Sequence, residues 1–341
     1  MLRRMVTFVS FLSVMLVATP TPTSAGQAAV LDEIVVTARK KEENRLQVPL
    51  SVSAFPAQSI RELGLDGLGD IARFTPGFSF DAAVGRQPAS DRPMIRGLTT
   101  IINGIANTSA ASTFIDGVYF GGSIQSSALY NLERVEVLRG PQSVQYGRGT
   151  YAGAVNYVTR RPGDELTGEL RVNVAEHDTL DTTGWLGGPL IEGQLGFYVA
   201  GGHREYGGEY VNTVDGRKVG GEESDEVTAK LYWTPHSSLD VTWQLAWQST
   251  DDGHYASYLQ PSTLNNCCFR TPAAPRAREY FDGTARPESR VTLATDLLAA
   301  AGGAGTRLDR RRTALDIAWT SSSGYLLESL TAYVDDELER G

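Results

Sequence analysis

Cysteine and histidine are scarce in this 341-residue chain, which has only two cysteines and four histidines. The histidines are dispersed, without the spacing of a metal site: His177, His203, His236 and His254. No serine or cysteine nucleophile stands in a recognisable motif with a histidine. Asp251-Asp252-Gly253 lacks the alternating ligands of a calcium-binding loop. The sequence therefore predicts no enzyme, no metal site and no cofactor.

The two cysteines, Cys267 and Cys268, are neighbours in a long polar stretch. A strained disulfide between them, two free thiols and an intermolecular bridge are all compatible with the sequence.

An excess of basic residues is also absent, because 31 Lys and Arg stand against 40 Asp and Glu. The net charge of −9 and the pI near 5.1 leave no basic face to neutralise phosphates, so we expect no nucleic-acid partner. After the N-terminus, no apolar run reaches the ~20 residues of a transmembrane helix. If the chain enters a membrane, it does so with β-strands.

The N-terminus has the three parts of an export signal. Arg3 and Arg4 precede an apolar run from Met5 to Ala18, and the small residues Thr23-Ser24-Ala25 follow. This order predicts a signal peptide that is cleaved near Ala25. The alternative is a membrane anchor, but the run is shorter than the ~20 residues that a spanning helix needs.

Residues 132–162 contain the most informative pattern in the chain. Val135 and Val137 alternate with polar residues, which predicts a short half-buried strand. Gly140-Pro141 breaks this strand and opens a helical turn. A glycine-rich crossing then leads into a second strand over residues 154–159.

The segment from Gly147 to Ala152 also fits the dinucleotide fingerprint G-x-G-x-x-G/A by letter. That fingerprint requires a strand directly before it and a helix directly after it. Here a helical turn precedes the glycines and a strand follows them, which disfavours a nucleotide site.

The stretch LRGPQSVQYGRGTYAGAVNYVTRRP, from Leu138 to Pro162, resembles the end of the plug domain of TonB-dependent outer-membrane receptors. Two further plug motifs precede it in the same order as in that family, MIRG over Met94–Gly97 and FIDGVYF over Phe114–Phe120. The resemblance implies an α+β plug domain followed by antiparallel transmembrane β-barrel strands.

A short β-branched segment lies ahead of this region on a polar leader. It consists of Asp32, Glu33, Ile34, Val35, Val36, Thr37 and Ala38. Such a segment is suited to pairing with the exposed edge of another sheet. It resembles the TonB box, the energy-coupling segment that the family presents to TonB. The alternative is that it forms the first strand of the plug.

The resemblance also implies a role for two arginines. Those of the family's IRG and LRGP motifs form ion pairs with carboxylates on the barrel wall, and here they are Arg96 and Arg139. A plug inside a polar lumen needs such contacts, because buried charges must be paired.

Within the plug, the sequence predicts a strand over 48–55, helices over 56–63 and 68–74, and a strand over 78–81. Residues 82–107, apart from Met94–Gly97, are polar and predict an irregular stretch.

After Pro162, alternation of apolar and polar residues predicts about seven strands, as in a transmembrane barrel. They lie near 167–175, 180–187, 194–205, 224–233, 239–249, 310–320 and 324–334. A soluble sandwich would also alternate, but Trp233, Trp247 and Trp319 cluster at strand ends, which favours a membrane.

A plugged transporter needs about 22 strands, so we expect the chain to be the N-terminal part of a longer receptor. The predicted domains are a signal peptide (1–25), a leader with the TonB box (26–47), a plug (48–162) and the first part of a barrel (163–341).

By resemblance, the implied function is energised import of a scarce ligand. The implied partners are TonB in the periplasm, outer-membrane lipid and a small ligand such as a ferric siderophore. Cobalamin, haem and carbohydrate importers share the same motifs. The alternative from another class is a truncated periplasmic module that keeps plug and box but transports nothing.

Overall fold

The computed structural model describes residues 35–37, 43–44, 49–65, 67–86, 91–98, 110–121, 132–253, 290–291 and 305–340. The predicted signal peptide and both cysteines lie outside these residues. All described residues belong to one unit, which begins at Ile34.

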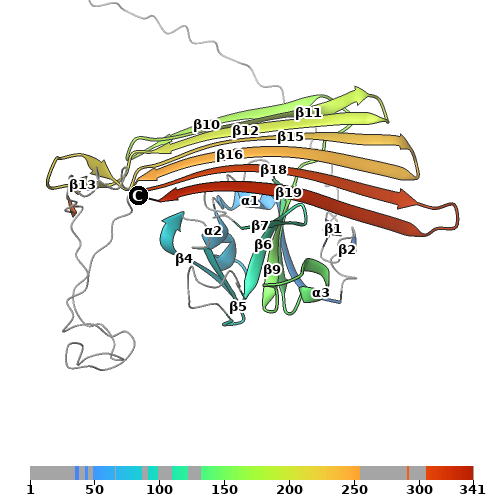
Figure 1. Ribbon diagram of the computed structural model, residues 1–341, viewed down its shortest axis with the longest axis horizontal. Coiled ribbons are helices and arrows are strands. Elements are labelled where there is room, and N and C mark those ends of the chain that lie inside the picture. Colours follow the sequence, from blue (N-terminus) through green and yellow to red (C-terminus); the bar gives the residue numbers. More distant parts are fainter. Residues whose placement is uncertain are drawn as a thin grey trace, which may run out of the picture. The chain divides into compact units, whose positions relative to one another are not determined.

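A five-stranded sheet forms the centre of the N-terminal half, in the order β3-β8-β9-β6-β7 (Figure 1). Its strands are β3 (Ser51–Pro56), β8 (Leu132–Arg139), β9 (Gly153–Thr159), β6 (Ala111–Ile115) and β7 (Val118–Phe120). Neighbours are antiparallel except β6 and β9, which are parallel. This mixed sheet, with the helices described next, confirms the α+β plug that the sequence predicts.

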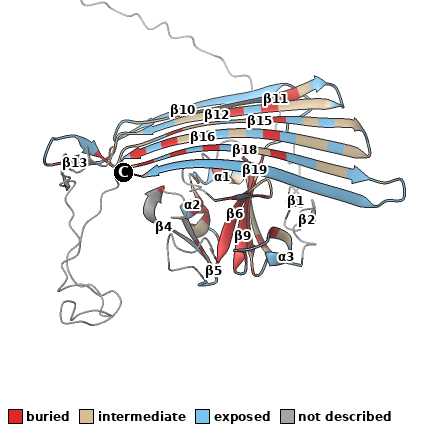
Figure 2. Ribbon diagram, viewed as in Figure 1, coloured by how far each residue is buried: buried red, intermediate tan, exposed pale blue. Residues whose placement is uncertain are grey.

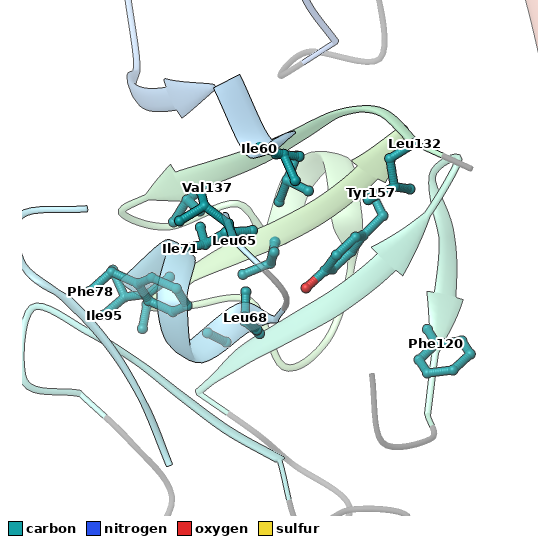
Figure 3. Packing of buried hydrophobic residues seen from close by; sticks show 14 of the residues in the cluster. Ile60, Leu65, Leu68, Ile71, Phe78, Ile95, Phe120, Leu132, Val137 and Tyr157 are labelled. Carbon is teal, nitrogen blue, oxygen red and sulfur yellow. The ribbon is translucent and has the colours of Figure 1, made fainter. Parts of the chain in front are cut away.

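Two short helices, α1 (Ala57–Glu62) and α2 (Leu68–Arg73), contribute to the main hydrophobic core. Figure 3 shows Ile60, Leu68 and Ile71 from these helices beside Val137 and Tyr157 from the sheet. Both helices start and end within about two residues of the predicted limits. No helix in the described part of the chain is long and apolar enough to cross a membrane.

The stretch that follows α2 is more regular than the sequence suggests. β4 (Phe78–Arg86) and β5 (Asp91–Ile95) pair as an antiparallel two-stranded sheet. The prediction of an irregular stretch from residue 82 is therefore wrong for these strands. Pairing uses backbone N–H and C=O groups, so the two strands can pair although their side chains do not alternate regularly between apolar and polar.

β8 also differs from its prediction. We expected a half-buried strand, yet Arg134 and Glu136 are 5% and 0% exposed. A second core cluster covers the other face of the sheet and includes Val36, Phe114 and Leu138. Both faces of β8 are therefore covered, and its alternating polar residues lie inside the protein.

The turn between β6 and β7 consists of two residues, Asp116 and Gly117, since Ile115 pairs with Val118. Their φ angles are 50° and 77°. Two successive positive φ angles characterise the type I′ hairpin turn, in which Asp-Gly is a preferred pair. This turn positions the carboxylate of Asp116, which Lys230 of the larger sheet binds.

The C-terminal half forms one antiparallel sheet of seven strands, in the order β10-β11-β12-β15-β16-β18-β19 (Figure 1). The strands are β10 (Thr167–Ala175), β11 (Thr179–Ile191), β12 (Leu195–Tyr206), β15 (Glu222–His236), β16 (Leu239–Gly253), β18 (Gly305–Thr320) and β19 (Leu326–Arg340). Each corresponds to one of the seven predicted strands, and most are longer than predicted. Among the described residues, β10 and β19 do not pair with each other, so the sheet is open.

Five shorter strands form two further small sheets. β1 (Val35–Val36) pairs with β2 (Glu43–Asn44), while β13 (Tyr210–Asn212) pairs with β14 (Lys218–Val219) and β17 (Arg290–Val291). A single helical turn, α3 (Ser143–Tyr146), connects β8 to β9. A helical turn before the glycines and a strand after them is the order that disfavours a nucleotide fingerprint.

Burial in the seven-stranded sheet is the reverse of that in a soluble protein (Figure 2). Along β16, Gln244 and Gln248 are 3% and 6% exposed, whereas Trp243, Leu245 and Trp247 are 40–46% exposed. The polar residues face inward and the large apolar ones face outward. This pattern is typical of a membrane barrel with a polar interior and disfavours the soluble sandwich.

Candidate functional site

The predicted TonB box is described only at Val35, Val36 and Thr37; Asp32, Glu33, Ile34 and Ala38 lie outside the described residues. Val36 is 0% exposed and packs in the second core cluster with Phe114 and Leu138. The predicted box is therefore not separate from the plug, because Val36 is part of the plug core.

Thr37 binds a buried carboxylate of the plug. Its backbone N–H donates to Glu136 Oε1 at 2.7 Å, and its hydroxyl lies 3.1 Å from each oxygen of Glu136. Arg134 Nε donates to the same carboxylate at 2.8 Å, so the buried negative charge has a cationic partner. Because charge-assisted hydrogen bonds are the stronger kind, these contacts hold the end of the box segment against β8.

Tyr146 covers the same contact from α3. Its hydroxyl lies 3.4 Å from the Thr37 carbonyl oxygen, which it can donate to. Burial, and then the charge of Glu136, raise the pKa of the Tyr146 hydroxyl, so it remains a neutral donor. Glu136 and Tyr146 therefore both bind the backbone of Thr37, while Arg134 pairs with the charge of Glu136.

A second polar cluster joins the plug to the seven-stranded sheet. Lys230 Nζ of β15 donates to Asp116 Oδ2 at 2.8 Å and also binds the Thr159 hydroxyl. Thr159 donates to both Asp116 oxygens, from its N–H at 2.9 Å and from its hydroxyl at 2.8 Å. The Lys230 side chain is 4% exposed and that of Asp116 is 22% exposed. This is an ion pair that is largely removed from water.

Burial alone raises the pKa of the Asp116 carboxyl, but the charge and hydrogen bond of Lys230, with the N–H of Thr159 and the charge of Arg312, lower it overall. Asp116 is therefore a carboxylate at neutral pH, and its negative charge is matched by Lys230.

Two further contacts connect the plug to this sheet. Arg86, at the end of β4, binds Asp252 through both Nε and Nη2 and lies 3.2 Å from Glu222. The guanidinium of Arg310 lies 4.4 Å from the ring centre of Phe120, a cation–π geometry. Charged and aromatic groups of the plug thus meet the polar inner face of the sheet at several points.

Arg96 and Arg139 do not take part in these contacts. Arg139 Nη1 donates to the carbonyl oxygen of Pro76 at 2.6 Å, and Arg96 is exposed with a positive φ of 54°. Among the described residues neither forms an ion pair with a carboxylate. Their proposed ion pairing with the barrel stays a prediction.

The residues that connect the plug to the sheet were not predicted from the sequence. Asp116 was visible as part of FIDGVYF, but nothing in the sequence pairs it with Lys230, which lies 114 positions later. Lys230 could have been noticed as a charged residue at an inward position of a predicted strand.

One group on the sheet brings together possible metal ligands. Single ligand atoms of His203, Glu223 and Asp225 lie within 4.8 Å of one another. They are partly exposed, and His203 Nδ1 lies 2.8 Å from Asp225 Oδ1 as in an ordinary surface ion pair. We assign no metal to this group.

An α+β domain bound to the polar face of an outward-apolar antiparallel sheet defines a class of protein, the plugged outer-membrane barrels. Residues 44–154 match the family model described as TonB-dependent Receptor Plug Domain. Residues 44–154 therefore form a TonB-dependent receptor plug domain, and the antiparallel sheet that follows matches the barrels of such receptors.

Several similar proteins are described as TonB-dependent receptors or outer-membrane transporters. The chain is 37% identical over 131 residues to the probable TonB-dependent receptor BfrD of Bordetella pertussis, covering 38% of this chain and 16% of BfrD. It is 30% identical over 141 residues to the probable TonB-dependent siderophore receptor PiuA of Acinetobacter baumannii, covering 41% and 18%. The ferrichrome outer membrane transporter/phage receptor of Escherichia coli is 26% identical over 254 residues, covering 71% and 32%. The matches thus span less than a third of each relative.

Solved structures show the same fold. The ferric yersiniabactin uptake receptor FyuA of Yersinia pestis superposes with a TM-score of 0.67 at 17% identity, over 85% of this chain and 41% of FyuA. The siderophore receptor PiuA of Acinetobacter baumannii gives 0.63 at 17% identity, over 87% and 38%. At these identities the likeness concerns the fold alone. The family consists of receptors and transporters rather than enzymes.

Proposed function

We propose that the protein is an outer-membrane receptor that imports an iron complex of the ferric-siderophore class, with energy supplied through TonB. The observation that carries the proposal is the reversed burial of the seven-stranded sheet, whose polar face binds the plug. Such a sheet is suited to a lipid environment, and a plug that fills the lumen must move or rearrange before a ligand can pass. Transport of this kind requires energy.

The cargo class is supported by the names of the relatives. PiuA is described as a siderophore receptor, and ferrichrome and ferrioxamine B appear in the names of two others. No catalytic constellation was found in the sequence, in keeping with a receptor. In the same proposal, residues 32–38 are the segment that TonB binds, and Arg96 and Arg139 pair with carboxylates of the barrel.

The experiment offers ⁵⁵Fe complexes of ferrichrome, ferrioxamine B and pyoverdine singly to cells that lack other iron receptors and produce the whole protein. We expect accumulation of at least one complex, with cyanocobalamin and haemin failing to compete. Competition by cyanocobalamin or haemin would change the cargo but keep the transporter. Absence of any accumulation, with the protein present in the outer membrane, would favour the non-transporting module.

Export is the remaining part of the proposal. The charged, apolar and small-residue order before Gly26 predicts cleavage near Ala25. N-terminal sequencing of the membrane-extracted protein should begin close to Gly26. A mature protein that retains Met1 would contradict export through a cleaved signal.

A further inference from the structure

Asn156 of β9 lies between the box segment and the turn that is bound to the seven-stranded sheet. The side chain is 3% exposed. Its Oδ1 accepts a hydrogen bond from the backbone N–H of Gly117 at 3.2 Å, and its Nδ2 donates to Thr37 Oγ1 at 3.3 Å. A single amide therefore contacts two segments that are far apart in the sequence.

The orientation of this amide follows from its partners. The backbone N–H of Gly117 can only donate, so it must face the amide oxygen. The NH₂ group of Asn156 then faces Thr37, whose hydroxyl accepts this bond and gives its own proton to Glu136. The Thr37 hydroxyl is satisfied in both directions only while Asn156 stays in place.

The other side of Asn156 is connected to the seven-stranded sheet through the two-residue β6–β7 turn. Gly117 follows Asp116 in the two-residue β6–β7 turn, and Asp116 is bound to Lys230 and Thr159. The Gly117 N–H belongs to the peptide unit that joins Asp116 to Gly117, and this unit is planar. A shift of Asp116 away from Lys230 therefore carries the Gly117 N–H with it.

We propose that Asn156 is a positioning residue that couples the attachment of the plug at Lys230 to the retention of the box residue Thr37. While Asp116 is bound to the sheet, Gly117 holds the Asn156 amide in the orientation that retains Thr37. When the turn leaves Lys230, the amide oxygen of Asn156 loses its fixed donor, the Gly117 N–H, and Thr37 is released more readily. The inference rests on the proposed function, because it assigns residues 32–38 to energy coupling.

Coupling between two sites acts in both directions. Withdrawal of Thr37 from Glu136 should therefore also weaken the hold of Asn156 on the turn. A pull on the leader would then loosen the plug where it contacts Lys230.

Release of the box segment can be followed without ligand, TonB or transport. Val36 is fully buried in the docked segment, so Val36→Cys should react with a maleimide only after release. The reporter is placed in the whole protein with Cys267→Ser and Cys268→Ser, and the labelling rate is measured in outer-membrane vesicles. Trypsin resistance of the plug checks that each variant remains folded.

Four variants of this reporter protein make the test. Asn156→Ala removes both amide contacts, and Asn156→Asp keeps the acceptor for Gly117 but replaces the donor to Thr37. Asp116→Asn retains a residue suited to the turn and removes the charge that binds Lys230. Asn173→Asp is the matched control, because Asn173 is exposed on β10, where its side chain lies 3.5 Å from Asp181.

We expect both Asn156 variants to raise the labelling rate about tenfold, as for the loss of about one buried hydrogen bond, with no change for Asn173→Asp. Asp116→Asn should also raise the rate, but adding it to Asn156→Ala should have no further effect. If the two changes multiply as independent sites do, or if Asp116→Asn leaves the rate unchanged, the coupling is refuted. If only Asn156→Ala is unfolded, Asn156→Asp replaces it in the double variant. Absence of iron uptake would contradict the proposed function, but it would not change the labelling rates that test the coupling.

Discussion

Replacing Lys230 with methionine is expected to destabilise the folded protein by about 3 kcal/mol, which is the lower end of the range for breaking a buried ion pair. Methionine has a similar length but no charge, so Asp116 would remain in a largely buried position without its cation. The lower end applies because Asp116 keeps 22% exposure. The measurement is the free energy of unfolding of the protein in detergent. Protease resistance of the plug is recorded at increasing denaturant concentrations to obtain it.

Two matched variants show whether the loss comes from the unpaired carboxylate. Lys230→Met combined with Asp116→Asn removes both charges and should regain most of the stability. Lys218→Met breaks the exposed pair with Asp178 and should change little, because exposed ion pairs contribute little. Equal losses for Lys230→Met and Lys218→Met would contradict the assigned role of Lys230.

An Ile34→Pro substitution is expected to reduce energised uptake to background while ligand binding at the cell surface stays within about twofold of the unchanged protein. Proline removes a backbone donor and fixes φ, which disrupts a strand that pairs by its edge. Ile34 is the better position than Val36 for this test, because Val36 also packs in the plug core. Binding at low temperature and uptake at growth temperature are measured on the same cells.

Val35→Ala is the control, since edge pairing depends on backbone groups and should tolerate a shorter side chain. Loss of binding together with uptake in Ile34→Pro would place residue 34 in the folded plug. Survival of both would mean that energy coupling lies in another segment.

The strands of the seven-stranded sheet could be predicted because alternation of outward and inward residues is a local property. β16, for example, repeats its pattern from Leu239 onward. Several predicted strands end too early, because the alternation of side chains stops there while the backbone pairing of the strands continues. At Asp251 the ladder with Arg307 still holds, although both outward residues are charged.

The contacts that carry function could not be predicted, because they join residues that are remote in sequence. Thr37 and Glu136 are 99 positions apart. Val135 and Val137 predicted one buried face for β8, and nothing local indicates that the leader and Phe114 cover the other face. Tertiary packing, rather than strand propensity, decides where Glu136 lies.

Energised import is tested most directly by comparing uptake in cells with and without TonB. The assay uses a ⁵⁵Fe complex that the receptor binds. We predict that surface binding is equal in the two strains, while accumulation inside the cell occurs only with TonB and stops when an uncoupler removes the proton-motive force. Equal accumulation in cells that lack TonB would contradict an energy-coupled receptor.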